Sequence, residues 1–371
     1  MICTLHDVVG RHKALDVRPG ALEDFTLGQG APASLEIVAA SRAWSLYCID
    51  AATRRAAFVE LPEAIDLAAA PFSAIPQFRE ARRVLLAPLE ALAALAERMP
   101  KPERTILVFS IGRCGSTLVN AILNHVEGVW ALSEPGALDT ILNAGDAISP
   151  GERRPLLEAA MRTLFRPPPS RPASIFAIKF RSQSLYSAKA LCDAAPGSRN
   201  LFLYRDGLGW ARSRHDAAQR IGRALGGGVD MVRLWGRLTA GAGEAELRAR
   251  TGMAIADLAN QHVMGALWTH SLDAYEALAR AGTPMLPIRY DALATRREAT
   301  VRKLLSYCGL PQDAATKAQA AYARDSQDGT VMKRTGDERP MGEEEREGFL
   351  RVLARNPRFS TPEARVSGDV G

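Results

Sequence analysis

TILVFSIGRCGSTLVNAILNH, residues 105–125, contains an apolar run, a short turn with two glycines and a helical pattern. The run at residues 106–111 is apolar on both faces, which predicts a strand buried in a parallel sheet. Gly112 and Gly115 interrupt the apolar run, and from Ser116 onward apolar residues recur at helical spacing. This stretch therefore predicts a strand, a turn and a helix in succession.

The predicted turn has the composition of an anion-binding loop. The first N–H groups of a helix have no partner within the helix, and they and the helix dipole favour an anion. The glycines let a ligand approach the backbone, Arg113 adds a planar cation, and Ser116 and Thr117 add hydroxyl donors. We expect this loop to bind a phosphate or sulfonate. An ordinary turn with a serine cap is the alternative for a Gly-x-x-Gly taken alone.

Two better-known phosphate loops do not match this spacing. The loop of nucleotide hydrolases needs a lysine directly after its last glycine, and Ser116 follows Gly115 here. A magnesium-nucleotide site is therefore not expected. A cysteine phosphatase would need an arginine six residues after Cys114, where this chain has Asn120. We exclude both classes.

The composition is that of a globular protein with a sizeable core. The chain has 371 residues, of which 47% are hydrophobic, enough for a full α/β domain and a smaller unit. The formal net charge is +6, and basic residues are interspersed with acidic ones. A small anionic ligand explains this charge as well as nucleic acid would, and we expect no nucleic-acid partner. A homo-oligomer is left open.

The cysteines and the apolar segments point to an intracellular protein. No cysteine pair has zinc-type spacing, so we expect reduced thiols and no metal site. No stretch approaches the roughly 18 apolar residues of a membrane span, and the first residues do not resemble a secretory leader. We expect a cytoplasmic location and no membrane span. The cysteines are Cys3, Cys48, Cys114, Cys192 and Cys308.

From residue 101 onward, strand and helix patterns alternate. Further short strands are predicted at residues 174–180, 200–204 and 285–289, with helical segments between them. This alternation predicts an α/β fold with a parallel central sheet and helices on both faces, of the P-loop nucleotide-binding type. We assign residues 101–371 to this domain.

Three basic side chains follow the predicted strands. Arg113 comes after the first strand, Lys179 ends the second and Arg205 follows the third. Because ligands bind at the carboxyl ends of parallel strands, we expect the three to converge on one crevice.

Residues 1–100 read as a small α+β domain of unknown role. Strands are predicted at residues 34–40, 45–50 and 56–61, and a helix rich in Ala and Leu at residues 80–98. In the later domain, the Gly-rich segment 222–243 surrounds a short amphipathic piece. It is either a substrate lid or a surface insertion without a specific role.

A second motif makes the nature of the anion more specific. LFLYRDGLGWARSR, residues 201–214, has Arg205 directly after a strand and Ser213 two turns along the next helix. SIGRCGSTL followed by this motif resembles the sulfotransferases that use 3′-phosphoadenosine 5′-phosphosulfate (PAPS). The alternative for Arg205 and Ser213 is a surface ion pair with Asp206 and a solvent-facing hydroxyl.

The resemblance covers about residues 105–340 and implies a nucleotide-binding set. The first motif would hold the 5′-phosphosulfate, and the arginine and serine of the second would hold the 3′-phosphate. TVMKRTG, residues 330–336, resembles the basic C-terminal loop that closes over the nucleotide. The segment at residues 288–311 resembles the family's late, mainly structural strand-loop-helix. The implied donor-binding residues are Arg113, Cys114, Gly115, Ser116, Thr117, Arg205, Ser213, Lys333 and Arg334.

The resemblance also implies catalytic roles. Lys179 lies where the family carries a lysine near the transferred group, and Arg113 would stabilise the 5′-phosphate. Many cytosolic members use a histidine two residues after this lysine, but Arg181 stands there. Glu134, in LSEPGALD, is the expected base, as in tyrosyl-protein-type members; a structural carboxylate paired with Arg113 or Arg181 is the alternative.

Other positions leave smaller questions open. His125 and His215 are fallback candidates for the base. Leu118 replaces the tryptophan that some members place after the threonine, so no adenine-stacking residue is named. Cys114 stands where serine is common.

Three functions remain in view. The first is a PAPS-dependent sulfotransferase acting on a small or medium-sized hydroxyl or amine acceptor without a metal. The second is a P-loop-type kinase or other phosphoryl transferase, which the missing lysine after Gly115 disfavours. The third is a non-catalytic nucleotide-binding sensor or scaffold.

Overall fold

A computed structural model describes residues 2–323, 325–333, 335–336 and 338–369. The chain divides into two compact units, neither of which is one continuous segment. The first unit comprises Met1–Leu107, Leu123–Lys179 and Ala190–Ser198, and the second comprises Val108–Ile122, Phe180–Lys189 and Arg199–Gly371. The domain boundary at residue 100 stays a prediction.

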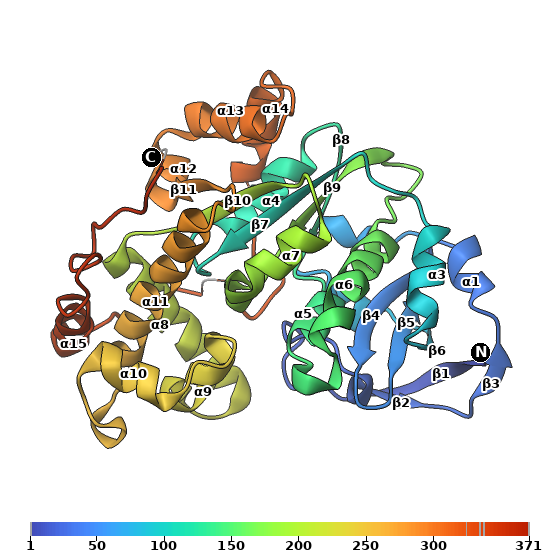
Figure 1. The fold of residues 1–371 in the computed structure, drawn as a ribbon, viewed down its shortest axis with the longest axis horizontal. Helices are drawn as coiled ribbons and strands as arrows, with labels where there is room; N and C mark the ends of the chain where they lie inside the picture. Colours follow the sequence, from blue (N-terminus) through green and yellow to red (C-terminus); the bar gives the residue numbers. More distant parts are fainter. Residues whose placement is uncertain (1, 324, 334, 337, 370–371) are drawn as a thin grey trace. The chain divides into compact units, whose positions relative to one another are not determined.

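The first part of the chain forms an antiparallel sheet (Figure 1, blue). The strand order is β2-β1-β6-β5-β4, and β3 pairs with β1. Short helices lie between the strands, so this region is α+β as expected. The elements are β1 (Cys3–Arg11), β2 (Phe25–Leu27), β3 (Ala31–Ala33), α1 (Glu36–Ala40), β4 (Trp44–Asp50), β5 (Arg55–Glu60), η2 (Leu67–Ala69), α2 (Ala74–Arg79), β6 (Arg83–Pro88) and α3 (Ala91–Glu97).

The strands predicted at residues 45–50 and 56–61 are confirmed as β4 and β5. Two predictions here are wrong. The strand expected at residues 34–40 is the short helix α1, and the helix expected at residues 80–98 is the strand β6 followed by α3.

The position of β6 in the sheet explains the second error. β6 pairs with both β1 and β5, and Leu85 lies opposite Leu5 and Phe58. Val84 and Leu85 are fully buried. The backbone bonds and apolar contacts of two neighbouring strands outweigh the weak helix propensity of Ala and Leu.

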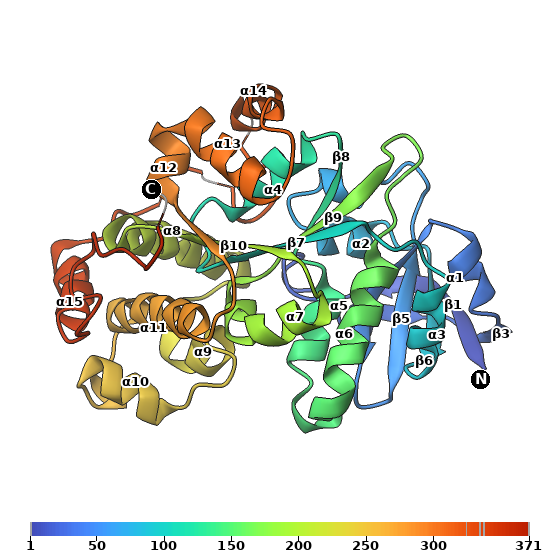
Figure 2. The ribbon, with the colours of Figure 1, turned by 45° about the horizontal axis from the view of Figure 1, so that its top comes forward.

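The second sheet has the order β11-β10-β7-β9-β8 (Figure 2). The pairs β8 with β9 and β10 with β11 are parallel, and helices flank the strands, which confirms the predicted α/β class. The strand β8 was not predicted. The strands are β7 (Arg104–Ser110), β8 (Gly128–Ser133), β9 (Ala173–Lys179), β10 (Arg199–Tyr204) and β11 (Leu286–Arg289).

The helix predicted from Ser116 is confirmed as α4. The amphipathic piece of the Gly-rich segment is the helix α9. The helices of this part of the chain are α4 (Ser116–Asn124), α5 (Gly136–Leu142), α6 (Pro150–Leu164), α7 (Ala188–Ala194), α8 (Gly207–Leu225), α9 (Met231–Leu238), α10 (Glu244–Thr251), α11 (Asn260–Arg280), α12 (Tyr290–Thr295), α13 (Arg297–Tyr307), α14 (Ala314–Ala318) and α15 (Glu343–Leu353). The 3-10 helix η4 (Ser182–Ser187) precedes α7.

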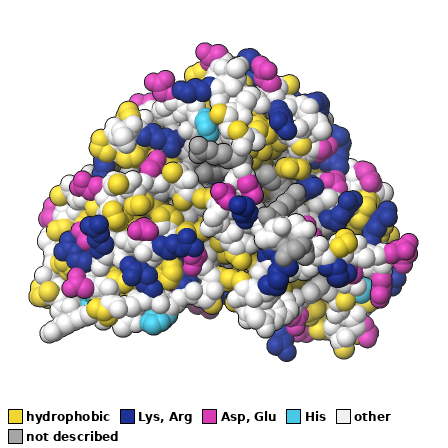
Figure 3. Space-filling model, turned by 180° about the vertical axis from the view of Figure 1, so that it is seen from behind, with side chains coloured by type: hydrophobic (Ala, Val, Ile, Leu, Met, Phe, Trp, Pro, Cys, Tyr) yellow, Lys and Arg dark blue, Asp and Glu magenta, His cyan; other side chains and the backbone are white. Residues whose placement is uncertain are grey.

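The surface carries charges of both signs. On the face drawn in Figure 3, Lys and Arg alternate with Asp and Glu, as the sequence indicates. Within the described residues, no helix is long and apolar enough to cross a membrane.

The β6 assignment predicts a specific pattern of stability. Replacing Leu85 with Ala leaves a cavity in a fully buried site, which costs about 2–5 kcal/mol. We expect a clear fall in the urea unfolding midpoint measured by circular dichroism. Leu86→Ala is the matched control, because Leu86 is only partly buried and should lose less. Equal losses in the two variants would contradict the strand.

Candidate functional site

The loop after β7 reverses the chain through unusual backbone geometry. Gly112, Arg113 and Gly115 have positive φ values of 71°, 56° and 84°. Glycine adopts such values readily, but the arginine does so at a cost in free energy. The N–H of Ile111 donates to the carbonyl oxygen of Leu203 over 3.1 Å, which ties the start of the loop to β10. The loop is therefore a fixed turn.

Aromatic side chains pack closely around the loop glycines. A Cβ on Gly115 would lie 2.8 Å from the ring of Tyr290, so a larger residue does not fit there. The indole N–H of Trp210 donates to the carbonyl oxygen of Gly112 over 2.9 Å. The contact with Tyr290 explains glycine at position 115, the positive φ explains glycine at position 112, and the bond from Trp210 ties the loop backbone to α8.

Cys114 has a structural role within this loop. Its side chain is fully buried, and its thiol donates to the carbonyl oxygen of Leu203 over 3.2 Å. A small sulfur therefore anchors the loop to β10. A thiol this deeply buried does not have the accessibility of oxidation-prone cysteines. A contact of Cys114 with an anion would come from its main-chain N–H.

The two sequence motifs meet at Arg113. Its Nε donates to the hydroxyl oxygen of Ser213 over 3.1 Å, and its Nη1 donates to Oε1 of Gln327 over 2.8 Å. Ser213 is 4% exposed, so the alternative of a solvent-facing serine is wrong. Ser116 and Thr117, in the first turn of α4, are also buried. The contact with Gln327 was not predicted, and nothing in the sequence pattern distinguishes this glutamine.

Arg205 is held on an aromatic ring. Its guanidinium carbon lies 4.6 Å from the centroid of Tyr290, the ring that also packs on Gly115. Its Nε lies 3.5 Å from a carboxylate oxygen of Asp206, which caps α8 by accepting from the N–H of Gly209. Tyr290 therefore links Arg205 to the loop. The resemblance implied only a mainly structural role for residues 288–311, the segment that contains Tyr290.

Arg214 is a candidate that sequence reasoning missed. Its guanidinium carbon lies 5.7 Å from the ring centroid of Trp210. It also lies beside the loop, since a Cβ added to Gly112 would be 3.6 Å from Nη1 of Arg214. Burial lowers the pKa of Arg214 to about 10, and no acidic side chain is among the causes of the shift. A partly buried cation that has no carboxylate partner among the described residues, beside a glycine loop, is suited to an anionic ligand.

In the first unit, Glu134 and Lys179 form an ion pair. The N–H of Glu134 also donates to the carbonyl oxygen of Lys179 over 2.7 Å, and Glu134 has a positive φ of 54°. Lys179 is 3% exposed, and its Nζ lies 5.2 Å from the ring centroid of Phe72. The structure therefore brings together the two residues predicted to act on the transferred group, and Phe72 is a further contact that the sequence did not indicate.

The C-terminal loop was predicted to supply two cations. Lys333 is half exposed, and its ammonium pairs with Asp328 over 2.6 Å. Arg334 lies outside the described residues. Gln327, three residues before this loop, accepts a hydrogen bond from Arg113. The roles of Lys333 and Arg334 on the nucleotide stay predictions.

The fallback bases have different surroundings. His125 is partly buried directly after α4. Nδ1 of His215 lies 3.9 Å from a carboxylate oxygen of Glu345. Neither the position of His125 nor the contact of His215 indicates catalysis. Among the described residues, no group of His, Cys, Asp or Glu side chains is arranged to hold a metal ion.

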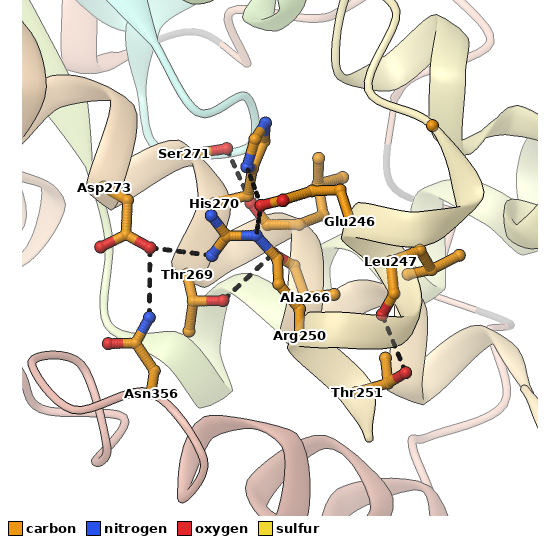
Figure 4. A network of polar contacts seen from close by, with 12 residues as sticks. Glu246, Leu247, Arg250, Thr251, Ala266, Thr269, His270, Ser271, Asp273 and Asn356 are labelled. Carbon is orange, nitrogen blue, oxygen red and sulfur yellow. Dashed lines mark hydrogen bonds and ion pairs between the residues drawn. The ribbon is translucent and has the colours of Figure 1, made fainter. Parts of the chain in front are cut away.

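Helix α10, which directly follows the Gly-rich segment, is anchored on α11 through a polar network (Figure 4). Arg250 of α10 donates to Glu246 over 2.7 Å and to Asp273 over 2.8 Å. His270 lies between Glu246 and the ring of Trp235, and burial, together with the charge of Arg250, lowers its pKa to about 4. His270 is therefore neutral at pH 7. A lid role for the Gly-rich segment stays a prediction.

The predicted convergence of Arg113, Lys179 and Arg205 on one crevice also stays a prediction. Within the second unit, Tyr290 links Arg205 to the loop that carries Arg113. Within the first unit, Lys179 and Glu134 form their own pair.

Comparisons with known proteins found distant structural likenesses. No protein-family model matches the sequence, and no curated protein matches it either. A mouse sulfotransferase complexed with PAP is similar at a TM-score of 0.40 and 12% identity, over 72% of this chain and 89% of that one.

Two bacterial structures are similar at the same level. The sulfotransferase domain of the Synechococcus PCC 7002 olefin synthase has a TM-score of 0.34 and 13% identity, over 62% of this chain and 80% of that one. A sulfotransferase from Alicyclobacillus acidocaldarius has a TM-score of 0.37 and 14% identity, over 69% of this chain and 94% of that one. All three are sulfotransferases, the family that the two motifs resemble.

Proposed function

We propose that this protein is a sulfotransferase that moves a sulfuryl group from PAPS to a hydroxyl or amine acceptor by in-line transfer. The observation that carries the proposal is the meeting of the two motifs in the second unit. Arg113 donates to Ser213, and the partly buried guanidinium of Arg214 lies beside Gly112. Cations and hydroxyls from both motifs are thereby concentrated around one glycine loop.

The side chains of this cluster fit a donor with separate anionic groups. We propose that the loop amides, Ser116 and Thr117 hold the 5′-phosphosulfate end together with Arg113. Arg205 and Ser213 would hold the 3′-phosphate, and Lys333 and Arg334 would add cations to the nucleotide. Arginine suits these roles, since its planar fork matches the geometry of phosphate oxygens.

Arg214 would supply further positive charge. Desolvation of this guanidinium is unfavourable in the free protein, and a bound anion would offset that cost. The free energy of anion binding is correspondingly greater than at an arginine that already has a carboxylate partner. No metal is needed for this charge balance.

Sulfuryl transfer needs an aligned acceptor, stabilisation of charge on the transferring oxygens and a proton or cation for the departing oxygen. We propose that Lys179 supplies the last of these, because it is buried and its ammonium carries protons to donate. Glu134 would take the proton from the acceptor. A positioned base of this kind contributes roughly 10²–10⁴ in rate.

The ion pair between the two residues suits these roles. As a pair, the lysine holds the proton that a leaving oxygen requires, and the carboxylate is available in the form that accepts one. Removing either partner would leave the other charge buried and uncompensated. The pair therefore holds the two side chains together in a site of low exposure.

The donor assignment predicts selective ligand stabilisation. We expect 3′,5′-ADP to raise the melting temperature of the protein and ATP with magnesium to leave it unchanged. A ligand at 100 times its dissociation constant adds about 2.7 kcal/mol to the free energy of unfolding. Differential scanning fluorimetry at matched ligand concentrations measures this. Stabilisation by ATP with magnesium alone would favour a phosphoryl transferase.

The role of Arg214 predicts a loss of affinity without a loss of stability. In Arg214→Gln we expect 3′,5′-ADP to bind roughly 10- to 100-fold more weakly, the effect of losing a hydrogen bond to a charged group. Calorimetric titration measures the affinity.

The unfolding midpoint of Arg214→Gln should be unchanged or higher, because the substitution removes a poorly solvated charge. Arg212→Gln on the exposed side of the same helix is the control. Equal affinities in the two variants would remove Arg214 from the site.

The roles proposed for Glu134 and Lys179 predict that their loss affects sulfuryl transfer but not nucleotide binding. We expect Lys179→Ala and Glu134→Ala to lose sulfuryl transfer while still binding 3′,5′-ADP, and Arg205→Ala to lose the binding. Transfer of labelled sulfate from PAPS to acceptors in a cell extract measures turnover.

Both single variants need a fold control, since a broken buried pair can destabilise by about 3–5 kcal/mol. Glu134→Gln, which keeps the shape of the side chain, provides it. Undiminished transfer in Glu134→Gln would eliminate this residue as the base, and binding without turnover in the unchanged protein across many acceptors would favour a sensor.

A further inference from the structure

Two adjoining cavities in the first unit share a pair of arginines. One has a volume of about 370 Å³ and the other about 290 Å³, and Arg42 and Arg166 line both. Arg42 lies in the segment between α1 and β4, and Arg166 lies two residues after α6. These residues belong to neither of the motifs that suggested a sulfotransferase, and no role has been assigned to them above.

The arginines contact main-chain oxygens and a sulfur. Arg166 donates to the carbonyl oxygen of Ser41 over 2.5 Å and to the sulfur of Met99 over 3.3 Å. Arg42 donates to the carbonyl oxygen of Pro167. In the described part of the chain, neither guanidinium forms an ion pair with a carboxylate, and Nε of Arg166 is buried without a hydrogen-bond partner.

The two charges repel each other, although only one of them is removed from solvent. Arg166 is partly buried and Arg42 is exposed. Burial, followed by the charge of Arg42, lowers the pKa of Arg166 to about 10. An anion beside the two guanidiniums would offset both the desolvation of Arg166 and the repulsion.

A shortage of acidic residues does not explain this arrangement. Other arginines of the same unit have carboxylate partners: Arg54 pairs with Glu90 over 2.7 Å, and Arg83 pairs with Glu60 over 2.6 Å. Arg98 likewise pairs with Glu36. Glu63 and Asp66 line the larger cavity together with the two arginines, but Asp66 pairs with Arg171, and among the described residues neither carboxylate pairs with Arg42 or Arg166.

A purely structural role accounts for only part of the geometry. The bonds to Ser41 and Pro167 join the segment before β4 to the segment after α6. One such bond uses one of the five donors of a guanidinium. Two carbonyl contacts do not require two cations side by side, since a neutral donor would serve as well.

The cavities have apolar and aromatic walls, and the larger one also has polar wall residues that include Glu63 and Asp66. The larger cavity is lined by Trp44, Trp130 and Leu164, and the smaller one by Phe165, Met99 and a run of prolines. Cavities of this size and lining bind drug-sized molecules through an apolar body and a few polar contacts. A ligand that fits them has an anionic head and an apolar or aromatic body.

We propose that the cavities flanking Arg42 and Arg166 form a binding site for a small amphiphilic oxyanion, whose head lies between the two guanidiniums and whose apolar body lies against Trp44 and Trp130. The site lies wholly within the first unit and does not depend on the proposed transfer activity. The shared chemistry is that of an aryl or alkyl sulfonate, phosphate or carboxylate.

The test compares matched probes by calorimetric titration of the full chain. 1-Naphthalenesulfonate, 1-naphthyl phosphate and 1-naphthoate carry different oxyanions on one aromatic body, and 1-naphthalenemethanol is their neutral analogue. We expect at least one anion to bind tenfold or more tightly than the alcohol. The rank of the three anions identifies the head group.

Variants locate the binding at the arginines. We expect Arg166→Gln and Arg42→Gln each to weaken the preferred anion about tenfold or more and to leave the alcohol unchanged. Arg82→Gln, at an exposed arginine of the same unit, should have no effect. Arg166→Lys, which keeps the charge but not the planar fork, should lose less than Arg166→Gln.

Three results would overturn the site. These are binding of the alcohol as tight as that of the anions, equal anion affinity in Arg166→Gln and the unchanged protein, and no binding of any probe at millimolar concentration. If Arg166→Gln does not fold, Arg42→Gln and Arg166→Lys decide by the same criterion. Unchanged 3′,5′-ADP affinity in these variants would separate this site from the proposed donor site.

Discussion

The chain passes from β7 into α4 through left-handed backbone at Gly112, Arg113 and Gly115, and the candidate site depends on that constraint. Gly112 and Gly115 adopt this geometry readily, whereas Arg113 is held in it. The ring of Tyr290 occupies the space that a side chain at Gly115 would need, and the thiol of Cys114 fastens the loop to β10. The same geometry directs Arg113 to the hydroxyl of Ser213.

The distribution of unpaired cations is the second organising feature. Many arginines of this protein have carboxylate partners, as Arg83 does with Glu60. Arg214 beside the loop, and Arg42 with Arg166 in the first unit, have none among the described residues. A buried cation without an acid costs free energy in the free protein, and a bound anion offsets that cost. This argument supports both the proposed donor site and the separate amphiphile site.

The parts of the fold that were predicted correctly have strong local patterns. The buried strand and helix around residues 105–125 and the strands β9, β10 and β11 are apolar runs bounded by breaks. β6 was misread as a helix because its Ala- and Leu-rich sequence suits either structure, and pairing with β1 and β5 decides between them. The segment that forms α1 was predicted as a strand because a helix of five residues is too short to show a helical pattern in the sequence.

The candidate site also has features that the sequence predicts and features that only the tertiary structure shows. Residue type and spacing alone predicted an anion loop with Arg113 followed by a motif with Arg205 and Ser213, because both signals are local to a strand end and the next helix. Only the tertiary structure decided that Glu134 pairs with Lys179 and that Arg214 has no acidic partner among the described residues. Burial and ion pairing depend on residues that are far apart in the chain, and no local pattern encodes which of them meet.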